Sequence, residues 1–159
     1  MREGRWVSGP WDDEPDEALW RDEATGFACA AFRVGWSGHW CGYVALPPEH
    51  PAHGLPDEYD YNVYVHGGAT YAGDLAHSAS LRLAMLTTAC GNSNPWWVGF
   101  DCAHSGDSSP LDITDGHRFG TYRTLAYVKQ QCAKLASELR DFRPAPPPPS
   151  EEEALTYDI

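Results

Sequence analysis

With 159 residues, 42% of them hydrophobic, and seven Trp, eight Tyr and five Phe, the chain can bury one core, which excludes a disordered protein. Its eleven Lys and Arg against 23 Asp and Glu give a formal charge of −12 and no basic patch, which excludes direct binding to nucleic acid. No run of about 18 apolar residues is present to span a membrane, and the first residues lack the apolar core of a signal peptide, so we expect a cytoplasmic protein.

Residues 1–25 form an acidic N-terminal segment, which we expect to pack on the body through Trp6, Trp11 and Trp20. A short helix is predicted over 16–24. Residues 1–23 hold eight acids and three bases, whereas 144–159 hold four acids and no base. Most of the negative charge therefore lies at the two ends of the chain. These ends are either segments that increase solubility or a charged docking arm. A protein that mimics DNA would instead carry the charge on its folded surface.

Two largely apolar segments, 27–34 and 39–46, read as strands and are joined by a turn-like GWSG, which predicts a β-hairpin. A Pro-rich loop follows. Residues 60–66 alternate apolar and polar side chains and predict another strand, ending at Gly67 and Gly68. With ATYAGD (69–74) after these glycines, the region is either a second hairpin or a strand with a sharp bend. The pattern over 75–90 fits either a helix or a strand, and the sequence does not decide between them.

A further strand is predicted over 96–104, and a helix over 121–142. The helix has one apolar stripe with a spacing of three or four residues: Leu125, Val128, Cys132, Leu135, Leu139 and Phe142. We therefore predict an α+β fold with a single domain over 26–143, in which this long C-terminal helix packs on one face of an antiparallel sheet of four to six strands. Pro144 ends the helix, and 144–159 form an extended, Pro-rich acidic tail.

The stretch WWVGFDCAHSGD (96–107) places reactive groups at the end of an apolar strand, where a rigid element fixes their positions. Glycines beside such groups allow backbone N–H donors to approach a ligand. Flat stacking surfaces are offered by four Trp residues, unless these simply pack in the core: Trp36, Trp40, Trp96 and Trp97. We therefore predict a pocket for a small polar, nucleotide-like ligand, although the phosphate loops GxxxxGK[ST] and GxGxxG are absent. The predicted ligand-binding residues are His39, His66, Gly67, Gly68, Asp101, His104 and Asp107.

Two alternatives involve catalysis. His39 with Cys41, and Cys102 with His104, are pairs of soft ligands two residues apart, and zinc is a cofactor that takes such a Cys2His2 set. Cys102 is also a candidate nucleophile with His104 or His66 as its base. The opposing hypothesis is that the five Cys are free thiols, with Cys41 and Cys102 simply buried.

Asp101 is a carboxylate within an apolar strand, so it needs a His, an Arg such as Arg33 or Arg123, or backbone donors as partners. On a regular strand Asp101 faces the opposite side from Cys102 and His104. It is a candidate catalytic residue, but it is not expected to orient His104 directly.

The motifs GHWCGYV (38–44), VHGG-TY (65–71), WWVGFDCAHSGD (96–107) and YRTLAYV (122–128) resemble a family of small uncharacterised proteins from bacteriophages and related bacterial genomes. The resemblance covers roughly 38–140. It implies a small accessory protein, acting in the host cytoplasm if phage-encoded. It implies no catalytic role for any residue.

Three functions follow as hypotheses. The first is a binding module for a small polar ligand or a host protein, with counter-defence as an extension. The second is a small hydrolase that uses zinc or the Cys102 thiol with a His. The third is a role in protein interaction alone, with the acidic ends as contacts.

Overall fold

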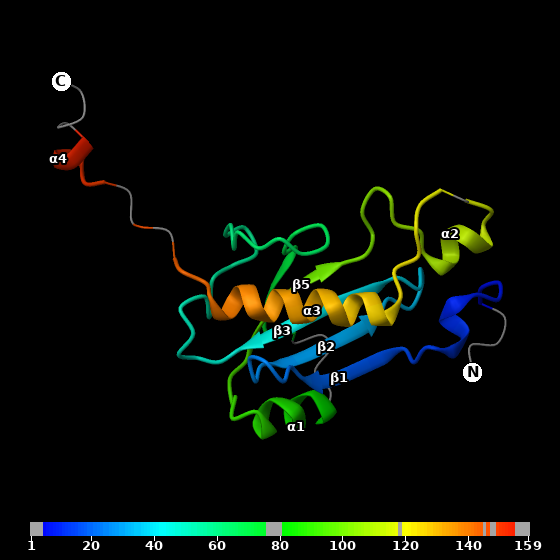
Figure 1. Ribbon diagram of the computed structural model, residues 1–159, viewed down its shortest axis with the longest axis horizontal. Helices are drawn as coiled ribbons and strands as arrows, with labels where there is room; N and C mark the ends of the chain where they lie inside the picture. The colour runs from blue at the N-terminus through cyan, green and yellow to red at the C-terminus, as the bar shows by residue number, and fades with distance from the viewer. Residues whose placement is uncertain (1–4, 76–80, 118, 145, 147–148, 155–159) are drawn as a thin grey trace.

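The computed structural model describes residues 5–75, 81–117, 119–144, 146 and 149–154 (Figure 1). No helix within these ranges is long and apolar enough to cross a membrane. In chain order the elements are η1 (Pro10–Asp13), β1 (Glu17–Arg21), β2 (Ala28–Arg33), β3 (Trp40–Leu46), β4 (Tyr71–Gly73), α1 (Leu81–Ala89), β5 (Trp96–Asp101), α2 (Pro110–Thr114), α3 (Leu125–Arg140) and α4 (Glu151–Ala154).

The five strands form one antiparallel sheet in the order β1-β2-β3-β5-β4. The predicted α+β class is confirmed, and so is the hairpin, which is β2 and β3 joined by the turn over 34–39. Because side chains alternate along a strand, Trp40, Val44 and Leu46 of β3 enter the core on one face of the sheet.

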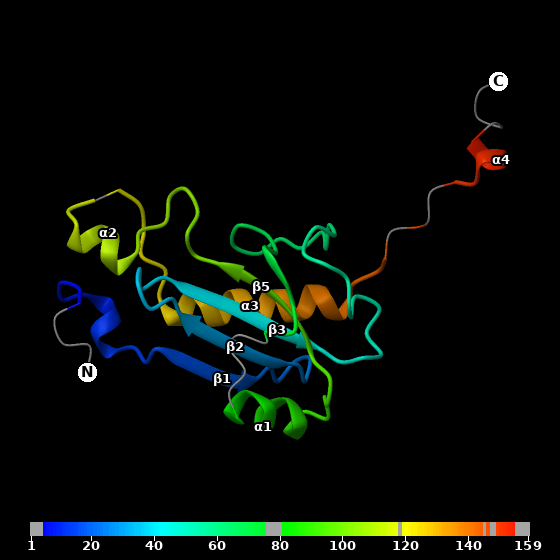
Figure 2. The ribbon, with the colours of Figure 1, turned by 180° about the vertical axis from the view of Figure 1, so that it is seen from behind.

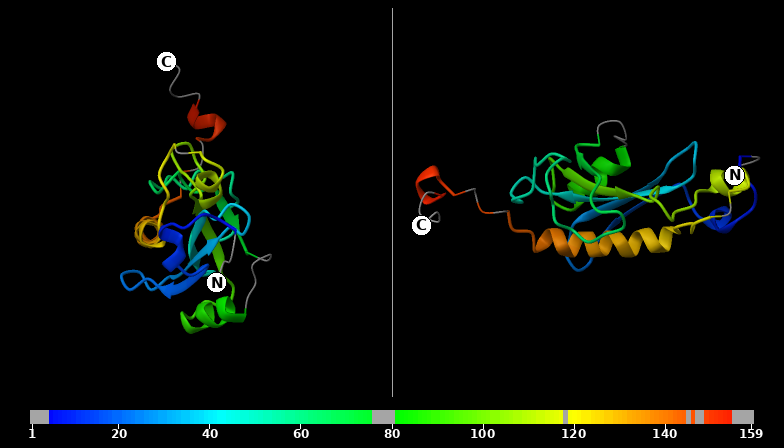
Figure 3. Two further views of the ribbon diagram at one scale, coloured as in Figure 1. Left: turned by 90° about the vertical axis from the view of Figure 1, so that its right-hand side faces the viewer. Right: turned by 90° about the horizontal axis from the view of Figure 1, so that it is seen from above.

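Helix α3 covers that face, as predicted, and lies along β2 and β3 (Figures 1 and 3). Its stripe from Leu125 to Leu139 is buried in the same core. Gly42 permits this close packing, since a methyl group there would lie 2.6 Å from the Phe100 ring and 2.8 Å from Cys132 Sγ. The helix begins at Leu125 and not at 121, because Thr124 caps it by accepting a hydrogen bond from the Tyr127 N–H.

The segment that the sequence left open is a helix over 81–89, and residues 76–80 of the predicted range lie outside the described part. This helix, α1, packs near β1 and β2 on the face of the sheet opposite α3 (Figures 2 and 3). A second, smaller core forms there around Leu83 and Trp97.

The helix predicted over 16–24 is wrong, since Glu17–Arg21 is the edge strand β1. The acidic N-terminal segment is joined to the body by Arg33, whose guanidinium binds Glu14 at 3.3 Å and Asp16 at 3.1 Å. Glu14 also accepts a hydrogen bond from the N–H of Leu125, the first residue of α3. The carboxylate thereby satisfies an orphan donor at the positive end of the helix.

The strand predicted over 60–66 is also wrong: the segment pairs with no strand of the described sheet, and side chains of α3 bind its backbone instead. Glu138 accepts a hydrogen bond from the Tyr64 N–H, and Lys134 donates to the Tyr64 carbonyl. Gln131 accepts from the His66 N–H at 2.9 Å. These bonds satisfy the polar backbone as a sheet ladder would.

Candidate functional site

The strand predicted to reach His104 ends three residues earlier, at Asp101. The Cys102 N–H still donates to the Trp40 carbonyl, but the chain then turns, with the Asp107 N–H bound to the His104 carbonyl at 2.9 Å. The alternation of a regular strand is therefore lost. Contrary to the prediction, His104 Nε2 lies 3.2 Å from Asp101 Oδ1.

Asp107 is the centre of this turn. Its carboxylate accepts hydrogen bonds from His66 Nε2 at 2.7 Å, Arg123 Nε at 2.9 Å and the His104 N–H at 3.0 Å. Burial alone would raise the pKa of Asp107, but the bonds from His66, Arg123 and His104 outweigh it and hold the pKa below its usual range. Asp107 is thus a buried carboxylate that joins two loops and the start of α3.

His66 connects this turn to α3. Its Nδ1 lies 2.7 Å from the Tyr127 hydroxyl, so the imidazole bridges a phenol and the Asp107 carboxylate. Burial raises the pKa of Tyr127 and keeps its hydroxyl protonated. The chain Asp107–His66–Tyr127 therefore joins the loop that carries His66 to the turn at Asp107 and to α3.

The two predicted glycines differ. At Gly67, where φ is +68°, an added methyl group would lie 2.2 Å from His104 Nε2, so the imidazole packs directly on this backbone. Nε2 of His104 is buried and has no hydrogen-bond partner among the described residues, because its contact with Asp101 is poorly aligned. At Gly68 an added methyl group would meet nothing within 4 Å.

In front of this turn lies a cleft of about 380 Å³, here called the His39–His104 cleft. It lies between the β2–β3 turn, the loop after β5 and helix α2. Its lining residues are Trp36, Ser37, His39, Cys102, Ala103, His104, Ser105, Asp107, Ser109, Leu111 and Asp112.

His39 and Trp36 form one side of the cleft. His39 Nδ1 lies 2.6 Å from the Ser37 hydroxyl, and burial lowers the pKa of His39 although Asp101, Asp107 and Asp112 oppose it. The imidazole of His39 is therefore kept neutral near pH 7. The Trp36 indole is 73% exposed and meets the His39 ring edge to face, with centroids 6.4 Å apart.

Three of the predicted ligand-binding residues, His39, His104 and Asp107, line this one cleft. His66 and Gly67 lie behind it and support Asp107 and His104. Asp101 also stands behind the cleft, where it accepts hydrogen bonds from Thr70 and from the Ala103 N–H. Gly68 is not part of the lining.

The zinc alternative receives no support from the geometry. Among residues 5–75, 81–117 and the other described positions, no group of three or more His, Cys, Asp or Glu is placed to hold a metal ion. The Cys2His2 hypothesis for His39, Cys41, Cys102 and His104 therefore lacks a site. Burial also raises the pKa of Cys41 to about 11.

Cys102 does not have the properties of a nucleophile. Its side chain lines the back of the cleft, and the residue is only 3% exposed. Burial, together with the negative charge of Asp107, raises the pKa of the Cys102 thiol far above the physiological range. A catalytic thiol needs the opposite environment, one that lowers its pKa.

Several residues of the site were missed in the sequence. Ser37 was seen only as part of a turn and Tyr127 only as part of the helix start, whereas Trp36 was one of four Trp residues expected to offer stacking surfaces. Tyr127 carries one indication of its role: it stands four residues after Arg123, whose guanidinium lies 5.1 Å from the Tyr127 ring centroid. No feature of the sequence indicates that Tyr127, near the start of α3, contacts His66.

Comparisons with protein families, with curated proteins and with solved structures gave no match for this chain.

Proposed function

We propose that the His39–His104 cleft binds a small, uncharged or cationic polar heterocycle of about nucleoside size. One observation carries the proposal: an exposed indole, Trp36, stands at a cleft of about 380 Å³ that is also lined by two imidazoles. The volume lies within the usual range of about 300–1,000 Å³ for ligand sites. An indole supplies a flat face for stacking, and imidazoles supply directional hydrogen bonds.

The charges near the cleft favour the base or nucleoside over the nucleotide. No Lys or Arg is found among the described residues of its lining, whereas Asp107 and Asp112 are. Asp112 is already engaged as the capping partner of Ser109 at the start of α2. Asp107 is paired with Arg123, but no cation of the described lining faces the cleft to bind a phosphate, so phosphorylation of a ligand should weaken its binding.

The His104 side chain is held before any ligand arrives. Gly67 lies against its ring, and Asp107 accepts a hydrogen bond from its backbone N–H. Because Nε2 is buried, Nδ1 is the ring nitrogen left for a ligand. A fixed donor or acceptor costs less ordering entropy on binding, which raises affinity.

The motif resemblance suggests where such binding would act. A small phage-type accessory protein that holds a base or nucleoside would interfere with a host process, counter-defence included. Capture of a host protein at the same cleft is the alternative within this hypothesis.

The test is a thermal-shift and calorimetric titration with adenosine, guanosine, cytidine and uridine, each beside its 5′-monophosphate. At least one nucleoside should raise the melting temperature at millimolar concentration and bind more tightly than its monophosphate. Trp36→Ala should weaken this binding by about two- to tenfold through loss of stacking. Tyr64→Ala is the matched control, because Tyr64 is also an exposed aromatic residue, at 70%, but does not line the cleft.

The proposal fails if none of the four nucleosides binds. It also fails if the monophosphates bind more tightly, or if Trp36→Ala and Tyr64→Ala change affinity equally. Because Trp36 is largely exposed, its replacement should leave the melting temperature of the free protein unchanged.

A further inference from the structure

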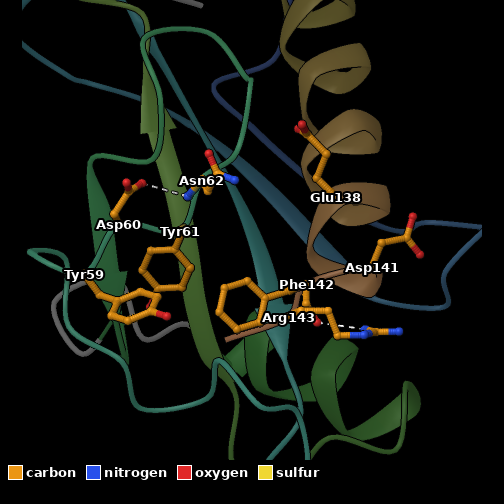
Figure 4. A pocket seen from close by; sticks show the side chains of 8 residues that line it. All are labelled: Tyr59, Asp60, Tyr61, Asn62, Glu138, Asp141, Phe142 and Arg143. Carbon is orange, nitrogen blue, oxygen red and sulfur yellow. Dashed lines mark hydrogen bonds between the residues drawn. The ribbon is translucent and has the colours of Figure 1, made fainter. Parts of the chain in front are cut away.

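A second cavity lies at the other end of α3, between the loop over 59–62 and the last turn of the helix (Figure 4). Its volume is about 600 Å³, and it shares no lining residue with the His39–His104 cleft. We call it the aromatic cavity. It is lined by Tyr59, Asp60, Tyr61, Asn62, Glu138, Asp141, Phe142 and Arg143.

Three aromatic rings pack together at its base. The Tyr59 centroid lies 5.5 Å from that of Tyr61 and 6.1 Å from that of Phe142, and the Tyr61 and Phe142 centroids are 6.2 Å apart. In Figure 4 these rings stand side by side below the open space between the loop and the helix. Tyr61 and Phe142 belong to the hydrophobic core and are only 4% and 7% exposed, so the partly buried Tyr59 offers the most ring surface. Aromatic faces carry negative partial charge and attract a cation that has apolar surface.

Carboxylates stand on both sides of the rings. Asp60 comes from the loop, and Glu138 and Asp141 come from the end of α3 (Figure 4). Two of these carboxylates are fixed by backbone donors, since Asp60 accepts from the Asn62 N–H at 2.9 Å and Glu138 accepts from the Tyr64 N–H at 3.0 Å. Their positions are therefore set by the fold.

The balance of charge at this cavity is negative. Three carboxylates line it against one lining cation among the described residues, Arg143, whose Nη1 donates to the Phe142 carbonyl at 2.9 Å. Asp141 is also paired with Arg140 at 3.2 Å, so Asp60 and Glu138 supply most of the uncompensated negative charge. Asp141 is the C-cap of α3, so the cavity also lies at the negative end of that helix dipole. The aromatic rings, the carboxylates and the C-terminal end of the helix all favour a positively charged ligand.

We propose that the aromatic cavity is a binding site for a small organic cation of the alkylammonium or quaternary ammonium class. A bare metal ion does not fit, because the described residues contain no group of three or more His, Cys, Asp or Glu placed to ligate one. An alkylammonium ion instead uses both features of the cavity: its charge meets the carboxylates and its carbons meet the rings. This site is independent of the nucleoside hypothesis.

The experiment is a calorimetric and NMR titration of the full chain with choline, and with its uncharged isostere 3,3-dimethylbutan-1-ol. Choline should bind and shift the ring signals of Tyr59, Tyr61 and Phe142, and the alcohol should bind at least about fivefold more weakly. The imidazole signals of His39 and His104 should not move, which separates this site from the other cleft.

The matched variants change charge without changing shape. Glu138→Gln/Asp141→Asn should weaken choline binding by about five- to twentyfold. The amide oxygen that the first substitution introduces can still accept the Tyr64 N–H, so the loop should keep its place. Glu23→Gln/Asp115→Asn removes the same charge from exposed positions that line neither cavity, and should leave the affinity unchanged.

The proposal is overturned if choline fails to bind at about 10 mM, which we take as the weakest dissociation constant of a specific site. It is also overturned if the alcohol binds as well as choline, or if both double variants have the same effect. Far-UV circular dichroism of each variant establishes that it is folded, so that a loss of binding reports on the site.

Discussion

The contact between Gly67 and His104 gives the sharpest test of how the site is built, because the neighbouring glycine supplies its own control. Gly67 and Gly68 have φ of +68° and +77°, so an alanine at either position costs about 1 kcal/mol in backbone strain. At Gly67 the new methyl group would also lie 2.2 Å from His104 Nε2, whereas at Gly68 it would meet nothing. Overpacking of this kind adds about 1–3 kcal/mol.

We therefore expect Gly68→Ala to lower the free energy of unfolding by about 1 kcal/mol and Gly67→Ala by about 2–4 kcal/mol. Urea unfolding followed by circular dichroism measures both values. Gly67→Ala alone should also displace the His104 ring and weaken nucleoside binding. Equal destabilisation by the two variants, within about 0.5 kcal/mol, would refute the inference that the His104 ring rests on Gly67.

Three further predictions concern ionisation. Asp107→Asn should destabilise the protein by about 2–4 kcal/mol at pH 7, because the buried carboxylate accepts three hydrogen bonds. The folded state lowers the pKa of Asp107, so the difference in unfolding free energy between wild type and Asp107→Asn should be complete above about pH 4. That difference should shrink as the pH falls through the folded-state pKa of Asp107. An unchanged difference near pH 2.5 would contradict this prediction. Burial lowers the pKa of His39 in the folded state, so on acidification the unfolded state binds a proton at this residue first. Between about pH 7 and 5 the wild type should therefore lose more stability than His39→Gln. Urea midpoints of the two proteins that fall by the same amount over this pH range would refute this. Iodoacetamide near neutral pH should modify partly exposed Cys90 before buried Cys102, as followed by mass spectrometry, and a faster Cys102 would restore the nucleophile hypothesis.

The parts of the fold with a strong periodic pattern were predictable. The stripe from Leu125 to Leu139 specified a buried helix face, and two apolar segments joined by the turn-like GWSG specified the β2–β3 hairpin. The helix bounds were less certain, because Thr124 begins the helix through a single side-chain bond that leaves the apolar stripe unchanged. The sequence pattern locates a helix or strand more accurately than it locates the first and last residues of that element.

The errors arose where tertiary contacts override a local pattern. Residues 60–66 alternate like a strand, yet their backbone is satisfied by Gln131, Lys134 and Glu138 from a helix far along the chain. Likewise β1 lies in an acidic stretch whose edge position is set by pairing with β2. Local sequence carries no trace of such partners.

The site shows the same division. Cys102, His104 and Asp107 of the motif 96–107 line one cleft. The assumption of a continuous strand, however, wrongly separated His104 from Asp101. Trp36 was one of four Trp residues expected to offer stacking surfaces, and only the fold distinguishes it, because Trp40 and Trp97 are buried in the two cores. The β2–β3 turn and helix α2 face each other across the cleft only in the folded protein, so the sequence did not predict that they share a site.

The most direct test of the central claim is an NMR titration of the histidine Cε1–Hε1 signals with the four nucleosides. His39 and His104 line the proposed site, whereas His50 and His53 bind the carbonyls of Leu139 and Asn94 elsewhere. We predict a saturable shift of the His39 and His104 signals with at least one nucleoside and no shift of the other two. Four stationary signals with every nucleoside, or equal shifts of all four, would contradict binding in the His39–His104 cleft.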